Sequence, residues 1–344
     1  MRFMKRESWV RLLFAAGATM VVALTLGVAH ADDKTYVIKV GTPTVNDTPE
    51  EFTRGFAQIV EKESGGRLKV EIYSASKLGS IPREIEGLQF GSIECGIFPP
   101  EFYVGIDERF EVLATPGMLD SLAHGQRLLA QPEVMKMMLG LGADKGLHGI
   151  GLYMALPSVL SSRTPIRTLA DLKGKKVRVF ASKFQTAAFE KLGATPIAMS
   201  TGDVLPALQQ GAIDGAISGI TVFNAMHFQD AAKYVTEINQ PPIFLVIEVS
   251  KKWFDALPKD LQDIIDKAGA AESVAINPYA AGLWQKARKS WVESGGELIS
   301  LPKDEQAEMM KTLEGVGENI AKSKPQLYEA FKVVTAAAER TRQP

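Results

Sequence analysis

The chain has 344 residues, one cysteine, 23% charged residues and a formal net charge of −1 at pH 7. A charge this close to neutral excludes the basic face that nucleic-acid binding requires, and a single cysteine excludes a disulfide framework. A chain of this length can bury a large core without cross-links, and it suggests two domains.

The N-terminal segment 1–31 has the composition of a secretory signal peptide. Basic residues at its start precede an apolar run over 12–28, and Ala29-His30-Ala31 supplies a small-x-small cleavage site. The apolar run approaches the length of a membrane span, so an uncleaved anchor is the alternative. We expect cleavage after Ala31, a periplasmic location and a mature chain that does not span the membrane. The segment holds four basic residues and one acid, so the net charge without it is −4.

Short β-rich runs alternate with amphipathic helical runs in the first half of the chain, which is the pattern of an α/β protein. Phe52, Phe56 and Val60 share one face of a helix predicted over 49–64, and Gly65-Gly66 ends it. Cys95 is expected to be a buried apolar residue rather than a nucleophile. Strands are predicted over 36–42, 68–72, 94–98 and 148–154, and further helices over 81–90 and 134–141.

The same alternation restarts after Arg163-Thr164-Pro165. Residues 258–294 have helical spacing, and Pro278 should kink or break that helix. No long linker separates the two halves, so we expect strands that cross between two domains and serve as a hinge. The predicted strands lie at 176–179, 195–199, 213–218 and 243–249, and further helices at 204–210 and within 304–342.

Arg178 is the residue that points most directly to a ligand. Strand side chains alternate between faces, so Val177 and Val179 share one side while Arg178 projects from the other. No acidic partner lies in the local run, and a charge beside a packed sheet is costly unless it is paired. A guanidinium meets a carboxylate through two parallel hydrogen bonds, so Arg178 is predicted to anchor an anion. A salt bridge between the lobes is the alternative role.

Several runs along the chain, taken together at their spacings, resemble the solute-binding subunits of tripartite ATP-independent periplasmic (TRAP) transporters. The resemblance covers essentially all of the mature chain. The runs are Phe56-Ala57, Glu63-Ser64-Gly65-Gly66-Arg67, Lys77-Leu78-Gly79, 88–93, 171–179, Leu192-Gly193-Ala194, Ala207-Leu208-Gln209 with Gly211, Asp214-Gly215, Trp253-Phe254 and Leu257-Pro258.

The resemblance implies an α/β fold of the periplasmic-binding-protein type, with two α/β lobes joined by hinge strands and a long helix spanning both. On this basis lobe I comprises 32–154 with 244–283, and lobe II comprises 155–243 with 284–344. It also implies a binding protein that is not an enzyme. Such a protein captures a small organic acid by hinge closure and delivers it to the TRAP membrane permease subunits. Neither a cofactor nor a metal is expected.

The resemblance also assigns residues to the ligand site. Arg178 matches the arginine that clamps the ligand carboxylate in most members. Ser218 stands where many members have an asparagine that contacts the same carboxylate, so the second polar contact departs from the family pattern. Pro157 stands where sialic-acid-binding members carry a further arginine, which argues against a polyhydroxylated sugar acid.

Other lining residues are expected where strands end, because ligands of α/β proteins bind there. Phe98-Pro99-Pro100 follows one such strand, Phe180 and Ala181 follow the Arg178 strand, and Thr221-Val222-Phe223 follows a third. Together they predict one cation in a mostly apolar, partly aromatic pocket. The expected ligand is therefore a monocarboxylate with a hydrophobic or aromatic body. Contacts from the first lobe near residues 98–102 are expected to favour the closed state.

Two other functions remain open at this point. A sensing subunit that reports a ligand to a membrane kinase would have the same sequence features. An exported hydrolase would need a nucleophile, a base and an orienting acid, and no such set is recognisable. Ser218 in Gly215-Ala-Ile-Ser218-Gly219 lacks the Gly-x-Ser-x-Gly spacing of a nucleophile elbow, and the histidines lack metal-ligand spacing.

Overall fold

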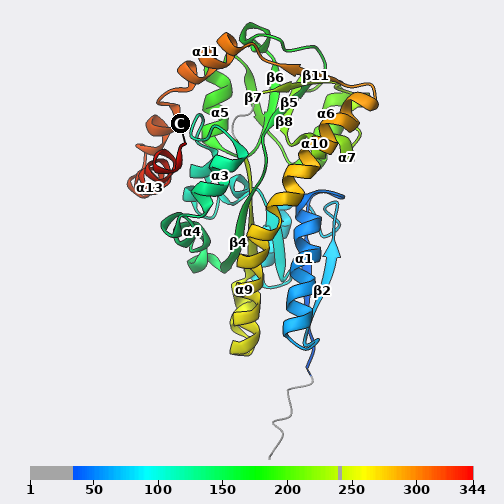
Figure 1. Ribbon diagram of the computed structural model, residues 1–344, viewed down its shortest axis with the longest axis vertical. Coiled ribbons are helices and arrows are strands. Elements are labelled where there is room, and N and C mark those ends of the chain that lie inside the picture. Colours follow the sequence, from blue (N-terminus) through cyan, green and yellow to red (C-terminus); the bar gives the residue numbers. More distant parts are fainter. Residues whose placement is uncertain (1–33, 239–241, 344) are drawn as a thin grey trace, which may run out of the picture. The chain divides into compact units, whose positions relative to one another are not determined.

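A computed structural model describes residues 34–238 and 242–343. The predicted signal peptide, 1–31, lies outside the described residues. From Thr35 onward the chain forms a compact unit that contains two β-sheets (Figure 1). Among the described helices, none combines the length and the apolar character that crossing a membrane requires.

The first sheet, with the helices on its faces, forms lobe I. Its strands run in the order β2-β1-β3-β10-β4; β1, β2 and β3 are parallel, and β10 is antiparallel to both β3 and β4. Helices α1 and α9 lie side by side on one face, and α2, α3 and α4 cover the other. The elements are β1 (Tyr36–Gly41), β2 (Leu68–Tyr73), β3 (Cys95–Phe98), β4 (Leu147–Leu156), β10 (Ile243–Ser250), α1 (Thr48–Glu63), α2 (Ile81–Phe90), α3 (Leu122–Leu129), α4 (Pro132–Leu139) and α9 (Lys259–Ala275).

The second sheet forms lobe II. Its strands run in the order β11-β9-β5-β8-β6-β7, with β6 parallel to both β7 and β8. Helices α5 and α11 contribute to the core on one face, and α6, α7 and α10 to the core on the other. The elements are β5 (Val159–Ser162), β6 (Lys176–Val179), β7 (Thr195–Ala198), β8 (Gly215–Ser218), β9 (Tyr234–Glu237), β11 (Glu297–Ser300), α5 (Lys183–Lys191), α6 (Thr201–Gln209), α7 (Ile220–Ala225), α10 (Asn277–Glu293) and α11 (Lys303–Leu313).

The chain crosses between the lobes as predicted. Strand β4 of the first sheet leads through Pro157 and Ser158 into β5 of the second. Helices α9 and α10 follow one another with only Ile276 between them, and Pro278 lies in the first turn of α10. The pair forms the long helical element that runs from one lobe to the other in Figure 1. The remaining elements are α8 (Lys251–Asp255), α12 (Val316–Ala321), α13 (Pro325–Thr341) and the 3-10 helices η1 (Pro100–Tyr103), η2 (Glu108–Ala114), η3 (Ala143–Lys145), η4 (Leu169–Leu172) and η5 (Phe228–Asp230).

The last helix, α13, returns to lobe I. It packs against α3, α4 and η2. The His124 side chain contacts the Ala338 carbonyl oxygen through Nε2 at 2.8 Å, and Arg127 Nε donates to the Thr341 carbonyl oxygen at 2.8 Å. The lobe boundaries expected from the sequence placed this helix with lobe II, and those boundaries remain a prediction.

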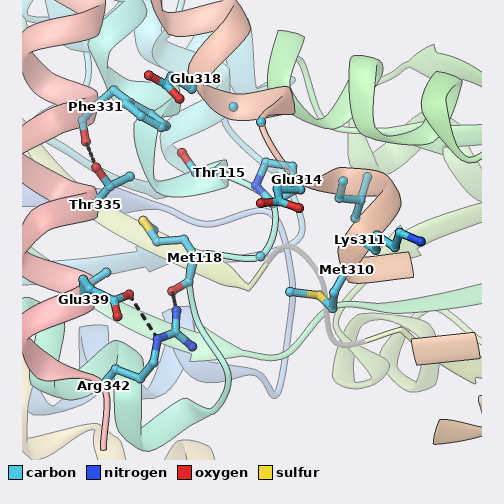
Figure 2. A pocket seen from close by; sticks show the side chains of 16 residues that line it. Thr115, Met118, Met310, Lys311, Glu314, Glu318, Phe331, Thr335, Glu339 and Arg342 are labelled. Carbon is cyan, nitrogen blue, oxygen red and sulfur yellow. Dashed lines mark hydrogen bonds and ion pairs between the residues drawn. The ribbon is translucent and has the colours of Figure 1, made fainter. Parts of the chain in front are cut away.

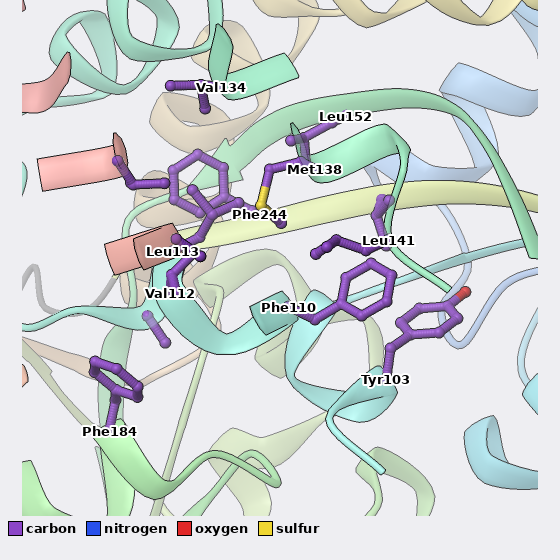
Figure 3. Packing of buried hydrophobic residues seen from close by; sticks show 14 of the residues in the cluster. Tyr103, Phe110, Val112, Leu113, Val134, Met138, Leu141, Leu152, Phe184 and Phe244 are labelled. Atoms are coloured by element: carbon purple, nitrogen blue, oxygen red, sulfur yellow. The ribbon is translucent and has the colours of Figure 1, made fainter. Parts of the chain in front are cut away.

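The largest apolar core lies on the α2 side of the first sheet, and it takes in a side chain of lobe II. Figure 3 shows Phe110 and Tyr103 in this core and, at its edge, Phe184 from α5. All three rings are fully buried. The lobes are therefore packed against one another on this side. Cys95 is buried and free, as predicted.

Candidate ligand-binding site

Arg178 lies on β6, where alternation of side chains separates it from the core. Val177 and Val179 belong to the apolar core of lobe II that contains α5 and α11. Arg178 projects from the opposite face, yet it is only 1% exposed. A fully buried guanidinium needs partners, because its transfer from water is costly.

Two backbone carbonyls of lobe II hold the Arg178 guanidinium in place. Nε donates to the Met199 oxygen at 2.9 Å, and Nη1 donates to the Ile217 oxygen at 3.0 Å. The guanidinium carbon lies 4.6 Å from the centre of the Phe180 ring, a cation–π arrangement. Nη2 is buried and has no hydrogen-bond partner. These contacts therefore fix the orientation of the guanidinium and leave Nη2 without a hydrogen bond.

No carboxylate neutralises Arg178 at contact distance. Within 34–238 and 242–343, no acidic oxygen lies within the 4.0 Å limit for an ion pair with it. Burial lowers the pKa of Arg178 to about 9, and the nearby charge of Glu101 opposes that shift. Burial also raises the pKa of Glu101, to about 8, which favours the neutral form of this acid. The site therefore holds a cation with little fixed countercharge.

A small cavity lies between the lobes beside this arginine. Its volume is about 40 Å³, enough for a few waters at most. Lobe I contributes Pro43, Thr44, Asp47, Thr48, Pro49, Pro99, Ala155, Leu156, Ile243 and Leu245, and lobe II contributes Phe180, Thr201, Ser218, Gly219, Thr221 and Val222. The cleft is therefore closed, and a small organic acid enters only through a more open form.

Three of the residues predicted from the sequence line this cavity: Pro99, Phe180 and Ser218. Arg178 is not itself among the lining residues; its guanidinium contacts the ring of Phe180, and the Ile217 carbonyl that it binds precedes Ser218 in the chain. Ala181 is half-buried and does not line the cavity.

The two remaining predicted residues lie in apolar cores instead. Phe98 is the last residue of β3, and its ring packs 6.4 Å from the ring of Tyr103 on the α2 side of the sheet. Phe223 stacks on Phe228 at 4.9 Å in the core of lobe II. In both places the side chain faces away from the cleft, and neighbouring residues, Pro99 and Val222, line the cavity.

Thr221 lines the cavity as predicted, whereas the polar lining residues Asp47 and Thr48 have no counterpart in the sequence prediction. Asp47 is 5% exposed; its Oδ1 accepts from the Thr48 backbone nitrogen at 2.8 Å, and its Oδ2 accepts from Thr44 Oγ1 at 3.3 Å. The hydroxyls of Thr48 and Thr221 are buried without partners. The sequence did contain a signal, because an Asp-Thr-Pro run after a strand indicates a helix N-cap. That capping role gave no reason to place Asp47 in a site.

The lobes touch through polar and aromatic contacts next to the cavity. Gln185 Nε2 of lobe II donates to Glu101 Oε1 of lobe I at 3.0 Å, and the Phe102 and Phe180 rings lie 5.9 Å apart. Glu111 Oε2 accepts from the Lys183 backbone nitrogen at 2.7 Å. These contacts come from the segment that follows β3, where the sequence predicted contacts that favour closure.

Larger hollows elsewhere suit an organic anion less well. One of about 500 Å³ is lined by the loop 115–118 and by α11, α12 and α13 (Figure 2). Its arginine, Arg342, already pairs with Asp120 and Glu339, and the lining holds three glutamates against two basic residues. Another of about 400 Å³ is lined by Pro157 and by Arg288, which pairs with Glu237 at 2.8 Å. Among the described residues, no three His, Cys, Asp or Glu side chains gather to hold a metal.

Comparison with known proteins identifies the family. The model for "Bacterial extracellular solute-binding protein, family 7" matches residues 40–324. The chain belongs to this family. The family consists of substrate-binding proteins of transporters, not enzymes.

Individual relatives agree with this assignment. The chain is 28% identical to the C4-dicarboxylate-binding periplasmic protein DctP of Rhodobacter capsulatus, over 90% of this chain and 94% of the relative. It is 25% identical to the 2,3-diketo-L-gulonate-binding periplasmic protein of Escherichia coli, over 74% of this chain and 77% of the relative.

Solved structures share the fold over most of the chain. A TRAP periplasmic solute-binding protein from Desulfovibrio salexigens, with bound orotic acid, superposes with a TM-score of 0.85 at 22% identity, covering 90% of this chain and 100% of that one. The sugar acid binding protein of Advenella mimigardefordensis, in complex with galactonate, gives 0.84 at 25% identity, covering 90% and 99%. The predicted TRAP resemblance and the two-lobed α/β fold are thus confirmed.

Proposed function

We propose that this protein captures a small organic carboxylate in the cleft between its lobes, with Arg178 as the anchor. The unused Nη2 of a buried, carbonyl-held guanidinium is the observation that carries the proposal. A ligand carboxylate would supply both the missing acceptor and the missing countercharge. Ser218, which lines the cavity next to the Ile217 carbonyl, is the second polar contact in this proposal.

The relatives support a carboxylate as the shared chemical group. Their names and bound molecules include C4-dicarboxylates, 2,3-diketo-L-gulonate, orotic acid and galactonate, and all of these are organic acids. They differ widely in the rest of the molecule. The relatives therefore support a site that binds a carboxylate. The nature of the rest of the ligand is inferred from the residues that line this cavity.

The lining supports a monocarboxylate with a compact hydrophobic or aromatic body. Prolines and aliphatic side chains of lobe I form one wall, and Phe180 and Val222 of lobe II contribute to the other. Among the described residues the lining holds no arginine, lysine or histidine, so Arg178, in contact with the lining residue Phe180, is the one cation proposed for the ligand. A second anionic end would find no further cation in the lining.

Capture follows a hinge mechanism in this proposal. Ligand enters the open cleft and pairs with Arg178 on lobe II, and the contacts of Glu101 and Phe102 with lobe II then stabilise the closed form. The ligand shifts the equilibrium only by its additional contacts in that form. The closed protein then docks on TRAP permease subunits in the membrane.

Export and lobe boundaries complete the proposal. We place signal cleavage after Ala31, lobe I at 32–154 with 244–283, and lobe II at 155–243 with 284–344. These boundaries divide the chain near the hinge; by sheet membership the ends of β4 and β10 belong to the first sheet, and α13 packs on that lobe. Mass spectrometry of the exported protein tests the cleavage site, since a mature chain beginning elsewhere would contradict it.

A thermal-shift screen of the mature protein against small organic acids tests the binding function. An acid at about 1,000 times its Kd should stabilise the native state by roughly 4 kcal/mol, and Arg178→Ala should abolish the shift. Arg163→Ala is the matched control, because that lobe II arginine is exposed and lies outside the cavity lining. Shifts that survive Arg178→Ala would move the anchor elsewhere.

A further inference from the structure

Asp47 places a second ionisable group in the same cavity, from the other lobe. It lines the cavity and is 5% exposed. Its Oδ1 and Oδ2 each accept one hydrogen bond, from the Thr48 backbone nitrogen and from Thr44 Oγ1. A carboxylate offers about four acceptor positions, so roughly half of its capacity remains.

The partners of Asp47 carry no positive charge. Among the described residues, no lysine, arginine or histidine forms an ion pair with it. Burial raises its pKa, and the hydrogen bonds from the Thr48 backbone and the Thr44 side chain, together with the nearby Thr221 hydroxyl, only partly oppose that shift. Asp47 is thus an acceptor-rich group on a wall that is otherwise mostly proline and aliphatic.

Two hydroxyls beside Asp47 have no partner. Thr48 is 1% exposed and Thr221 is 5% exposed; both line the cavity, and neither Oγ1 makes a hydrogen bond. Thr48 belongs to lobe I and Thr221 to lobe II, so closure brings the two hydroxyls to one cavity. Buried hydroxyls without partners are uncommon and call for an explanation.

We propose that the ligand carries a hydrogen-bond donor, a hydroxyl or an amino group, which Asp47 accepts while Arg178 holds the carboxylate. This inference rests on the proposed function, since it assumes that an acid occupies the cleft. Thr48 and Thr221 complete the subsite, because a hydroxyl both donates and accepts. The ligand class is then a hydroxy or amino monocarboxylic acid with a compact apolar body.

The same subsite selects against dicarboxylates. A second carboxylate placed near Asp47 would either repel it or require one of the two acids to take up a proton. The C4-dicarboxylates named for the Rhodobacter capsulatus relative should therefore bind this protein weakly.

Isothermal titration with matched acids at pH 7 tests the inference. The pairs are lactate with propionate, 2-hydroxyisovalerate with isovalerate, and mandelate with phenylacetate. Valine tests an amino group in place of the hydroxyl, and succinate tests a dicarboxylate. A hydrogen bond to a charged acceptor predicts that the hydroxy or amino member of the best-fitting size binds roughly 10- to 100-fold more tightly than its unsubstituted partner. Comparison of valine with 2-hydroxyisovalerate identifies the donor.

Two variants of Asp47 separate its capping role from recognition. Serine and asparagine cap helices about as well as aspartate, so Asp47→Ser and Asp47→Asn should keep α1 intact. Asp47→Ser removes the carboxylate, so the affinity ratio between the hydroxy acid and its unsubstituted partner should fall to within about threefold. Asp47→Asn keeps an acceptor oxygen and should lose chiefly the preference for an ammonium group. Thermal unfolding checks that both variants fold.

The outcomes distinguish the two proposals. Equal affinity for both members of every bound pair, a preference that survives Asp47→Ser, or tight succinate binding would overturn the Asp47 subsite and leave the carboxylate anchor in place. Binding that Arg178→Ala does not weaken would overturn the anchor alone. If no acid of the panel binds, both proposals fail.

Discussion

Two places in the molecule bury ionisable side chains without a full set of partners, and their surroundings differ. In the cleft, two carbonyls and an aromatic ring orient Arg178, and a cavity lies beside it. In the core of lobe I, Glu84 and Glu248 are 0% exposed, with no hydrogen bond to either carboxylate oxygen. The Tyr103 hydroxyl beside them is also unpartnered.

A glycine makes room for one of the two glutamates, Glu84. In the first sheet Gly41 pairs with Gly96, and Gly96 pairs with Glu248. A Cβ at Gly41 would overlap the Glu84 carboxylate. Neither acid lines the cleft cavity. These carboxyls therefore lie inside packed protein.

The buried glutamates and Arg178 avoid an unpaired buried charge in different ways. A buried carboxyl without hydrogen bonds becomes neutral by keeping its proton, and burial raises the pKa of Glu84 to about 7 and raises that of Glu248 well above its ordinary value. A guanidinium stays charged even when burial lowers its pKa to about 9, so it needs an anion. A buried ionisable group indicates a ligand site only when it keeps its charge and borders a cavity.

The largest expected effect concerns Arg178 in the cleft. Arg178→Ala should weaken binding of the best acid by about 3 to 5 kcal/mol, the scale for losing one partner of a desolvated ion pair. That is about a hundredfold to several-thousandfold in Kd, measured by isothermal titration. Glu248→Gln is the matched control and should leave Kd within about threefold. A similar loss in both variants would mean that the two places do not differ.

The next prediction concerns the core side and the pH dependence of stability. The folded protein keeps the Glu84 proton up to about pH 7, whereas the unfolded chain loses it near the ordinary value of 4.5. Folding takes up a proton in this window, so the free energy of unfolding should fall as the pH rises from 4.5 to 7. Glu84→Gln should therefore be more stable than the wild type by about 1 to 3 kcal/mol at pH 8, and nearly equal at pH 4. Denaturant unfolding at both pH values measures this, and equal stability at pH 8 would contradict it.

A smaller effect links closure to pH through Glu101. Closure buries this acid, and burial raises its pKa to about 8. The charge of Glu111 raises this pKa as well, whereas the charge of Arg178 lowers it. Opening should return Glu101 to the ordinary range, so closing takes up a proton and ligand affinity should fall as the pH rises from 6 to 8. The fall should be at most about tenfold per pH unit. Glu101→Gln keeps an acceptor for Gln185 and should flatten the profile, and an unchanged profile would rule out this linkage.

The smallest effect concerns the aromatic contact between the lobes. Phe102→Ala removes the ring that lies 5.9 Å from Phe180 and should weaken binding by about 1 kcal/mol, or roughly fivefold in Kd. Phe90→Ala is the control, because Phe90 is 68% exposed at the end of α2. Titration of both variants with one acid gives the comparison, and equal affinities would exclude a contribution of Phe102 to closure.

The sequence predicted most of the long elements, because their patterns are local. Helix α1 has its buried face at Phe52, Phe56 and Val60 as expected, and Pro278 separates α9 from α10. Strands β5, β9 and β11 were not predicted. They form through pairing within the second sheet, which the local sequence pattern does not encode.

The site was predictable in part for the same reason. Arg178 stood out because it is charged within an apolar strand, and local alternation gave its direction. Which aromatic ring enters the cleft depends on tertiary packing, so Phe180 lines the cavity whereas Phe98 and Phe223 lie in cores. Asp47 escaped prediction because a helix cap and a ligand contact have the same local sequence.

The small volume of the closed cleft has a consequence for binding kinetics. A cavity of about 40 Å³ cannot admit an organic acid, so ligand-free molecules in this form must open before they bind. The apparent Kd is then the intrinsic Kd divided by the fraction of open molecules. If opening is slow, the observed association rate should level off at high ligand concentration, at the rate of opening. Substitutions that loosen the contact between the lobes would then speed association while they shorten the lifetime of the complex.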